Sequence, residues 1–386
     1  MEIYQPAEDS YLLNKYVKEH SIGRVLDMGT GSGIQALKAA EGKNVKGVVA
    51  VDINKKAVAE LKKFGNRKIN TFVSDLFSKI DGKFDLIIFN PPYLPQDKGI
   101  DEPALYGGKK GWEISEKFFE NVSKHLMPNG KILFLFSSLT NQKKIDEIIS
   151  NNLFEFKLLG KQKLELFEEL YVYLVEKSKL LRKLESKHVE NVKYFNHGKR
   201  GDIFIGTLDK KHYIKSHFAK SEKIKVAIKI ERKESKAIER ITNEIRWLKV
   251  LNKRGIGPKL LVYGSDYFVY EFVSGVEIKN YVGKDLNKIL VNVLGQCYLM
   301  DQLGVDKEEM HHPLKHIIID KLGIPVMIDF ERCHKTDKPK NVTQFVEFVC
   351  RMKDKSFDVD SLRKLAGEYK MRYDPKILEK LIKTIS

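Results

Sequence analysis

The feature that most constrains the fold is a regular alternation of apolar runs with helical patterns between residues 24 and 137. The apolar runs are short and rich in Val, Ile, Leu and Phe, as buried strands are. The segments between them are long enough for crossover helices, which join parallel strands. The sequence therefore predicts an α/β, doubly wound parallel sheet. Its expected strands are Arg24–Met28, Val45–Asp52, Asn70–Leu76, Phe84–Asn90 and Lys131–Ser137.

Two more extended stretches, Phe154–Leu159 and Glu169–Val175, follow a helical pattern at Gln142–Ser150. Too few residues separate them for a crossover helix, so we expect an antiparallel hairpin. A seven-stranded, mostly parallel sheet closed by such a pair resembles the Rossmann-like S-adenosylmethionine methyltransferase fold. This first domain would be complete at about Lys177.

A second domain is expected because 386 residues exceed the size at which one hydrophobic core keeps growing. The pattern changes at Ser178, where a charged segment leads into short strands and then helices. We predict a methyltransferase domain at 1–177, a charged linker at 178–192 and an α+β domain at 193–386. The expected elements of the latter are strands at Asp202–Lys215, Lys223–Ile230, His316–Ile319 and Pro325–Asp329, and helices at Ser235–Asn252 and Asp285–Leu303.

Composition argues against a membrane or disulfide-stapled protein. No apolar run approaches bilayer length, and the N-terminus lacks a basic and apolar leader. The chain has three cysteines, Cys297, Cys333 and Cys350, without a CxxC pair, so neither a disulfide framework nor a zinc ribbon is expected. These features predict a soluble, cytoplasmic protein.

The net charge of +17 is concentrated in the second half. Residues 1–177 carry 26 Lys and Arg against 24 Asp and Glu, whereas the remainder carries 43 against 28. This asymmetry is typical of contact with an anionic partner such as RNA or a ribosome. A lysine-rich surface that is merely solvated explains it equally well.

A glycine-rich turn, Asp27–Gly33, follows the first predicted strand and precedes a helix starting near Ile34. Such glycines let the backbone approach a ligand at a helix N-terminus, which suits a nucleoside cofactor. Acidic residues then end the next two strands: Asp52 can accept the ribose hydroxyls, and Ser74 with Asp75 can receive the adenine amino group. Each could also simply cap a helix.

The sequence Asn90-Pro91-Pro92-Tyr93 ends the fourth predicted strand, at the edge where open α/β sheets bind ligands. A planar amide or aromatic amine is a poor nucleophile, so an enzyme must hold its two N–H groups and aim its nitrogen. The Asn90 side-chain oxygen and the Pro91 carbonyl can each accept one N–H, while Tyr93 stacks on the planar group. These four residues are the predicted catalytic group.

These motifs, together with Pro6-Ala7-Glu8-Asp9 before the first strand, resemble the release-factor glutamine N5-methyltransferases, in particular their archaeal and eukaryotic branch. The resemblance covers nearly all of residues 1–177. It implies methylation of the glutamine in the Gly-Gly-Gln loop of a class I release factor, aided by a small zinc-ribbon activator. It also implies a substrate entrance along Gly107–Gly111. The expected S-adenosylmethionine-binding residues are Glu8, Asp9, Asp27, Gly29, Thr30, Gly31, Gly33, Asp52, Ile53, Ser74, Asp75 and Asn90.

Two other functions fit the same motifs. Adenine N6-methyltransferases use an Asn-Pro-Pro-Tyr motif in the same way, to hold an exocyclic amine of RNA or DNA whose base is flipped out of its stack. The near-neutral charge of residues 1–177 disfavours this alternative, although the basic second half could supply phosphate contacts. The chain could also be a non-enzymatic, ribosome-associated binding module.

The second half resembles protein kinases, and in particular predicted archaeal serine/threonine kinases. Lys229 in Val226-Ala227-Ile228-Lys229 and Glu244 on the next helix look like the kinase lysine and its helical partner. Glu271 lies in a hinge-like Tyr-Glu-Phe-Val, and Asp329 in an Asp-Phe-Glu that replaces the metal-binding Asp-Phe-Gly. The resemblance implies that these residues bind ATP and that Asp329 holds Mg²⁺.

The kinase catalytic loop does not match. Counting back from Asp329 places His316 and His311 where kinases have an asparagine and an aspartate. Phosphoryl transfer needs metal ligands and an oriented hydroxyl, so an atypical kinase, a nucleotide-binding pseudokinase and a scaffold all stay open.

Overall fold

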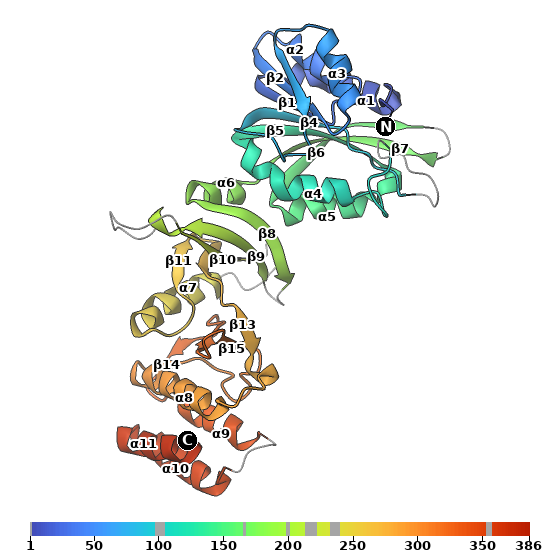
Figure 1. Cartoon of the computed structure of the whole chain (residues 1–386). Helices are drawn as coiled ribbons and strands as arrows, with labels where there is room; N and C mark the ends of the chain where they lie inside the picture. The colour runs from blue at the N-terminus through green and yellow to red at the C-terminus, as the bar shows by residue number, and fades with distance from the viewer. Residues whose placement is uncertain are drawn as a thin grey trace. The chain divides into compact units, whose positions relative to one another are not determined.

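The computed structural model describes residues 2–96, 105–164, 167–197, 201–212, 222–231, 240–352 and 357–386. The chain forms two compact units, Met1–Tyr194 with Gly206–Leu208, and Phe195–Ile205 with Asp209–Ser386. Figure 1 shows the elements of both units along the chain.

The first unit contains a seven-stranded sheet in the order β3-β2-β1-β4-β5-β7-β6. Strands β1 to β5 pair in parallel, and β7 pairs antiparallel with both β5 and β6. The predicted Rossmann-like sheet with its closing hairpin is confirmed. The strands are β1 (Gly23–Met28), β2 (Val45–Asp52), β3 (Ile69–Val73), β4 (Phe84–Phe89), β5 (Leu126–Ser137), β6 (Phe154–Lys163) and β7 (Glu169–Lys177).

Helices cover both faces of this sheet. Helices α1 (Glu8–His20), α2 (Ile34–Ala40) and α3 (Lys55–Lys63) contribute to an aliphatic core with one face of the sheet. The other face packs aromatic rings against α4 (Glu113–Val122), where Phe118 stacks on Phe89 with ring centroids 4.3 Å apart. Helix α5 (Gln142–Asn151) lies beside α4. Because both faces are buried, the central strands are apolar throughout rather than alternating.

The residues predicted as a charged linker, 178–192, form regular structure. Helix α6 (Lys179–Ser186) begins directly after β7, and β8 (Val189–His197) follows it. The Ser178 side chain caps α6 by accepting from the Leu181 N–H at 3.1 Å. The Lys177 side chain is completely buried and bonds Glu185 of α6 at 2.7 Å. The charge of this segment therefore belongs to an amphipathic helix attached to the first unit.

A five-stranded sheet in the order β11-β12-β10-β9-β8 opens the second half. The predicted strand at 202–215 ends earlier, at Asp209, and a short 3-10 turn follows it. The part of the predicted helix at 235–239 lies outside the described residues. The remaining bounds are β9 (Gly201–Asp209), β10 (Lys223–Glu231), α7 (Arg240–Leu251), β11 (Leu260–Tyr263) and β12 (Tyr267–Glu271).

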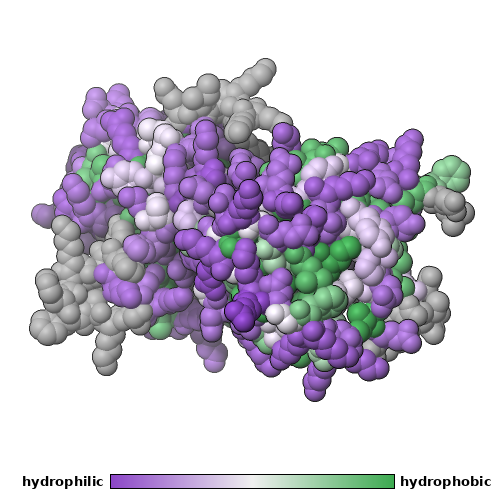
Figure 2. Space-filling view, turned by 90° about the horizontal axis from the view of Figure 1, so that it is seen from above, coloured by the Kyte–Doolittle hydropathy of each residue, from purple (hydrophilic) through white to green (hydrophobic). Residues whose placement is uncertain are grey.

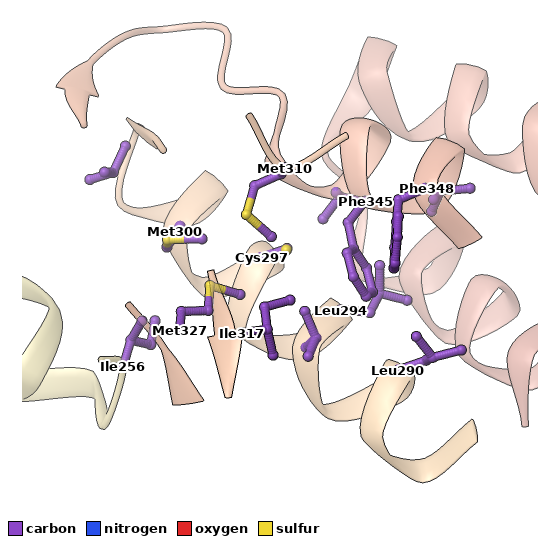
Figure 3. Packing of buried hydrophobic residues seen from close by; sticks show 14 of the residues in the cluster. Ile256, Leu290, Leu294, Cys297, Met300, Met310, Ile317, Met327, Phe345 and Phe348 are labelled. Carbon is purple, nitrogen blue, oxygen red and sulfur yellow. The ribbon is translucent and has the colours of Figure 1, made fainter. Parts of the chain in front are cut away.

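The rest of the second unit is mainly helical around a continuous apolar core. In Figure 3 the sulfur-containing side chains of Cys297, Met300, Met310 and Met327 gather in this core. Its elements are β13 (Gly275–Glu277), α8 (Leu286–Gln302), β14 (Val305–Asp306), β15 (Ile317–Asp320), β16 (Pro325–Met327), β17 (His334–Lys335), α9 (Asn341–Cys350), α10 (Val359–Arg372) and α11 (Pro375–Ile385).

The surface is mostly hydrophilic where Figure 2 shows it, with apolar residues gathered in small areas. Within the described ranges, none of the helices is long and apolar enough to cross a membrane.

Candidate active site

A cavity of about 310 Å³ opens at the carboxyl ends of β1 to β4. This is the edge at which a doubly wound sheet binds its ligand. The structure brings nearly all the predicted methyltransferase residues to this one place, whereas Glu8 and Gly33 are not in the wall. The predicted residues that line the cavity are Asp9, Asp27, Gly29, Thr30, Gly31, Asp52, Ile53, Ser74, Asp75, Asn90, Pro91, Pro92 and Tyr93.

The glycine-rich turn adopts left-handed backbone at Gly29, Gly31 and Gly33, with φ of 66°, 51° and 83°. A side chain at Gly33 is also sterically excluded, because its Cβ would lie 2.5 Å from Leu61 Cδ1. Gly33 thus serves the close packing of α2 against α3, while Gly29 and Gly31 face the cavity. The turn needs glycine for two separate reasons, backbone conformation and packing.

Asp27 holds this turn in shape. Its Oδ2 accepts the Thr30 hydroxyl at 2.6 Å and the Ala36 N–H at 3.1 Å. The carboxyl is buried, and burial raises its pKa to about 7, against the opposing effect of these two hydrogen bonds. Although Asp27 lines the cavity, its bonded oxygen faces its own chain, so its main contribution is to position the glycine backbone.

Asp52 lies at the end of β2, in the place predicted for ribose recognition. One carboxylate oxygen accepts the Gly31 N–H at 2.9 Å and the other accepts the Asn54 N–H at 2.8 Å. Each oxygen keeps a second lone pair for a ligand hydroxyl. Ser74 is already engaged, because its hydroxyl donates to the Leu76 carbonyl at 2.9 Å. This leaves Asp75, which is exposed at the cavity rim, as the free carboxylate of that pair.

The Asn90 side chain is held in one orientation. Its Nδ2 donates to Asp9 Oδ2 at 2.8 Å, and its Oδ1 is buried with no hydrogen-bond partner in the described part of the chain. A buried oxygen without a partner is costly unless a ligand completes it. Asn90 itself lines the cavity, so the residue predicted to accept a substrate N–H has an unused acceptor among the described residues.

Tyr93 follows the two prolines and lines the same cavity. Burial, and secondarily the charge of Asp9, raises the pKa of its phenol well above the ordinary value. The ring is therefore neutral at physiological pH and suited to stacking on a planar group rather than to removing a proton. The Tyr93 carbonyl accepts the Thr140 hydroxyl at 2.8 Å, which fixes the end of the turn.

The segment Gly107–Gly111 packs against the turn formed by Asn90–Tyr93 instead of lining the cavity. A Cβ on Gly107 would lie 2.4 Å from the Pro92 carbonyl oxygen, and one on Gly111 would lie 2.5 Å from the Tyr93 carbonyl oxygen. The glycines thus permit a close approach of two backbone segments. Leu105, just before this segment, is the residue that reaches the cavity wall.

Sequence reasoning missed several residues that line the cavity from the N-terminal segment and from α2. Tyr4 donates its hydroxyl to Asp9 Oδ1 at 3.0 Å, and the Gln35 side chain donates to the Ser10 carbonyl at 2.8 Å. Asn54 reaches back to the Glu2 carbonyl at 2.9 Å. The sequence did offer a signal for Tyr4, because this residue lies just before the Pro-Ala-Glu-Asp motif.

In the second unit the predicted lysine and its partners do come together. Lys229 Nζ lies 2.6 Å from Glu244 Oε2, 3.3 Å from Asp329 Oδ1 and 3.8 Å from Glu331 Oε2. Burial lowers the lysine pKa, but Glu244 and Asp329 outweigh burial and raise it, so the ammonium is charged. Asp329 has φ of 64°, a strained conformation of the kind that gathers at functional sites.

The other predicted members of this group are less directly engaged. Glu271 is exposed at the end of β12, and its backbone N–H donates to the Lys259 carbonyl at 3.0 Å. His316 Nε2 lies 3.8 Å from Asp329 Oδ2, whereas His311 offers its carbonyl to Arg351 at 3.1 Å. Lys307, which the sequence did not single out, donates its Nζ to the Asp329 carbonyl at 2.6 Å.

A dedicated metal site is not built here: the described ranges contain no cluster of three or more His, Cys, Asp or Glu that could hold an ion. Asp329 alone offers a partly exposed carboxylate. This donor set fits Mg²⁺ only when nucleotide phosphates complete the coordination, as they commonly do.

Comparison with known proteins assigns the first unit. Residues 7–163 match the family described as the methyltransferase small domain. A putative protein N5-glutamine methyltransferase of Methanocaldococcus jannaschii is 40% identical over 179 residues, covering 44% of this chain and 90% of that protein. A release factor glutamine methyltransferase of Lactococcus lactis is 34% identical, covering 28% of this chain and 45% of that protein. The human methyltransferase HEMK2 is 29% identical, covering 38% of this chain and 78% of that protein.

Proposed function

Since the chain belongs to the S-adenosylmethionine-dependent protein N5-glutamine methyltransferases, we propose that its first unit methylates the side-chain nitrogen of a glutamine in a translation release factor. The observation that carries the proposal concerns Asn90, a residue of the cavity wall: its Oδ1 is buried and has no hydrogen-bond partner within the described part of the chain. It is an acceptor in the place where a primary amide must be held.

S-adenosylmethionine supplies an electrophilic methyl group when it is bound. The residues that would hold it are Asp52 at the ribose hydroxyls, Asp75 at the adenine amino group, and the Gly29–Gly31 backbone beside them. The glycines leave open space at their Cα atoms: a Cβ on Gly29 would meet nothing closer than 4.0 Å and one on Gly31 nothing closer than 3.7 Å. The cavity lining therefore fits a nucleoside cofactor.

Asn90 Oδ1 and the Pro91 carbonyl then accept the two N–H groups of the substrate amide. This fixes the amide plane and directs its nitrogen at the methyl group, while the neutral Tyr93 ring packs on that plane. The chain supplies positioning and preorganised acceptors, not a strong base. The amide nitrogen would take the methyl group as the bond from that carbon to the cofactor sulfur breaks, and the displaced N–H proton would leave through the acceptor that holds it to solvent.

The release factor is the proposed substrate because the bacterial relative bears that specificity in its name. The matched region covers 45% of that relative's length. A small zinc-ribbon activator protein is the proposed partner. Methylation of an exocyclic adenine amine is the competing function, and a cofactor-binding module without activity is a further alternative.

The test is methyl transfer from radiolabelled S-adenosylmethionine to the release factor or to total RNA, with and without the activator. We expect label on the glutamine of the Gly-Gly-Gln loop. Asn90→Ala should reduce transfer at least about 100-fold, because one of the two preorganised acceptors is lost, while calorimetry still shows cofactor binding. Label on RNA adenine alone would show that the activity is nucleic-acid modification. Absence of cofactor binding would favour the non-enzymatic module.

A second function, binding of a nucleoside triphosphate with Mg²⁺, is proposed for the second unit. The Lys229–Glu244–Asp329 cluster supports it, because a fixed ammonium beside a partly exposed carboxylate suits phosphates and their metal. Lys229→Met should abolish ATP·Mg²⁺ binding in calorimetry. Lys249→Met is the matched control, since Lys249 is an exposed lysine on α7 whose Nζ lies over the Tyr263 ring. Equal ATP binding by both variants would contradict this function.

A further inference from the structure

We infer that Asp9 is a positioning residue for methyl transfer: it sets the orientation of the Asn90 amide so that Oδ1, and not Nδ2, faces the substrate. This inference rests on the proposed function and adds a role for a residue that does not itself touch the reacting atoms.

The two ends of the Asn90 amide have opposite hydrogen-bonding character. Oδ1 accepts and Nδ2 donates, so only one of the two orientations can hold an amine N–H. The backbone at Asn90 does not select between them, because rotation of the terminal amide is soft. A fixed acceptor on one side of the amide is required to make the choice, and Asp9 Oδ2, 2.8 Å from Nδ2, is that acceptor.

Asp9 is itself held firmly. The residue is 4% exposed, and its Oδ1 accepts the Ser10 N–H at 2.5 Å and the Tyr4 hydroxyl at 3.0 Å. These two donors lock one oxygen, so the other points at Asn90 without freedom to rotate. A carboxylate has acceptors only, which means that Asp9 cannot tolerate the opposite amide orientation.

The same contacts predict what an asparagine at position 9 would do. The Ser10 N–H is a backbone donor that requires an oxygen, so the new side chain would place its Oδ1 there and its Nδ2 toward Asn90. Asn90 would then turn over to offer Oδ1 to that donor. The flipped Asn90 amide presents N–H groups to the substrate amide nitrogen, which also carries N–H groups. Productive binding of the substrate is therefore lost.

The test is a swap of the two side chains in the full-length protein. Asp9→Asn should lower kcat for release-factor methylation about 10- to 100-fold with little change in cofactor affinity, because one preorganised acceptor is turned away. The double variant Asp9→Asn/Asn90→Asp pairs the new donor at position 9 with a carboxylate at position 90, whose second oxygen restores an acceptor for the substrate. We expect it to recover at least about tenfold over Asp9→Asn, a rescue that a merely structural role for Asp9 does not explain.

Asp146→Asn is the matched control, because Asp146 also accepts a tyrosine hydroxyl, that of Tyr173 at 3.0 Å, but lies outside the cavity lining. It should leave methylation at the level of the unmodified protein. Full activity of Asp9→Asn, or a double variant no better than the single one, would overturn the inference. Loss of cofactor binding in Asp9→Asn would also overturn it, since Asp9 would then act on the cofactor site.

A second measurement does not depend on the methyl acceptor. In ¹⁵N-labelled full-length protein, the Asn90 Nδ2 protons should exchange slowly and shift downfield, because one of them is bonded to a buried carboxylate. Asp9→Asn should abolish both properties, and their persistence would overturn the inference. If the unmodified protein labels no release factor while this signal behaves as expected, the proposed substrate is wrong and the positioning role of Asp9 stands.

Discussion

Around the cavity, the three aspartates at the strand ends differ in their hydrogen bonds and in their exposure. Asp27 faces inward and shapes the turn, Asp52 holds two backbone N–H groups and keeps spare lone pairs, and Asp75 stands exposed at the rim. Three aspartates at successive strand ends therefore have three distinct roles. Residue type and position at a strand end do not distinguish these roles; the hydrogen bonds do.

Asp52 carries a prediction about cofactor affinity. Asp52→Ala removes the acceptor for ribose hydroxyls and also the bonds that order the Gly31 and Asn54 backbone. We expect the dissociation constant for S-adenosylmethionine, measured by calorimetry, to rise by about tenfold or more, with the Asp146→Asn variant unchanged. Retained affinity in Asp52→Ala would mean that the glycine backbone alone holds the nucleoside.

Asp27 carries a prediction about pH. Its folded pKa of about 7 lies above the ordinary 3.8, so the folded state binds the proton more tightly than the unfolded chain does. Its contribution to stability is full below about pH 4 and is lost as the pH rises toward about 7, by up to roughly 4 kcal/mol. Asp27→Asn should remove this slope.

The slope can be followed in the first unit alone. Trp112 and Trp247 are the two tryptophans of the chain, one in each unit, so urea unfolding in a Trp247→Phe background reports the first unit through Trp112 fluorescence. Parallel pH profiles with and without the Asp27→Asn substitution would show that Asp27 does not titrate in this range.

At the scale of elements, a buried lysine links α6 to the first sheet through an ion pair. Lys177 Nζ donates to the Ser123 and Leu126 carbonyls at 2.7 and 2.9 Å, as well as to Glu185. The lysine is fully buried, and burial lowers its pKa against the opposing effect of Glu185. The pair therefore joins the end of β7, the start of β5 and helix α6 through a single ammonium group.

Removing one charge of this pair should lower the unfolding free energy more than removing both charges does. Glu185→Ala leaves a buried ammonium without its counter-charge, and we expect a loss of about 3 to 5 kcal/mol in the unfolding free energy of the first unit. Lys177→Met/Glu185→Leu replaces the pair by apolar side chains and should be clearly less destabilising. Urea unfolding followed by Trp112 fluorescence measures both, and equal losses would contradict the proposed role of the pair.

At the scale of the whole chain, the two halves differ in net charge. The near-neutral first half suits a protein substrate, whereas the excess of 43 basic over 28 acidic residues beyond position 177 suits an anion. Lys376, Lys380 and Lys383 are exposed along α11 and recur at helical spacing. They form a basic stripe on the C-terminal helix.

This stripe gives a prediction about RNA. Replacing Lys376, Lys380 and Lys383 with Gln should weaken RNA binding in filter assays and reduce the slope of log affinity against log salt by up to about 3. Replacing Lys43, Lys46 and Lys62 of the first unit, which are also exposed, is the matched control and should have little effect. Equal effects of both triple variants would indicate a lysine surface that is only solvated.

The sequence by itself determined the order of strands and helices in the first unit, because continuous apolar runs and helical periodicity are local signals. It also placed the Gly29–Gly31 turn, Asp52, Asp75 and Asn90, since motifs at strand ends converge wherever a parallel sheet forms. In the second half it identified Lys229, Glu244 and Asp329, and the fold brings both carboxylates within 3.3 Å of the lysine ammonium.

Only the tertiary structure decided how those groups are oriented and supported. The Asp9–Asn90 bond joins residues 81 positions apart, the Lys307–Asp329 contact depends on the backbone of a strained turn, and Lys177 meets Glu185 only when α6 folds back. Long-range hydrogen bonds have no local periodicity, so a local sequence pattern does not predict them. The sequence therefore determined which functional groups are present, and the packing of distant segments decided how each of these side chains is oriented and held.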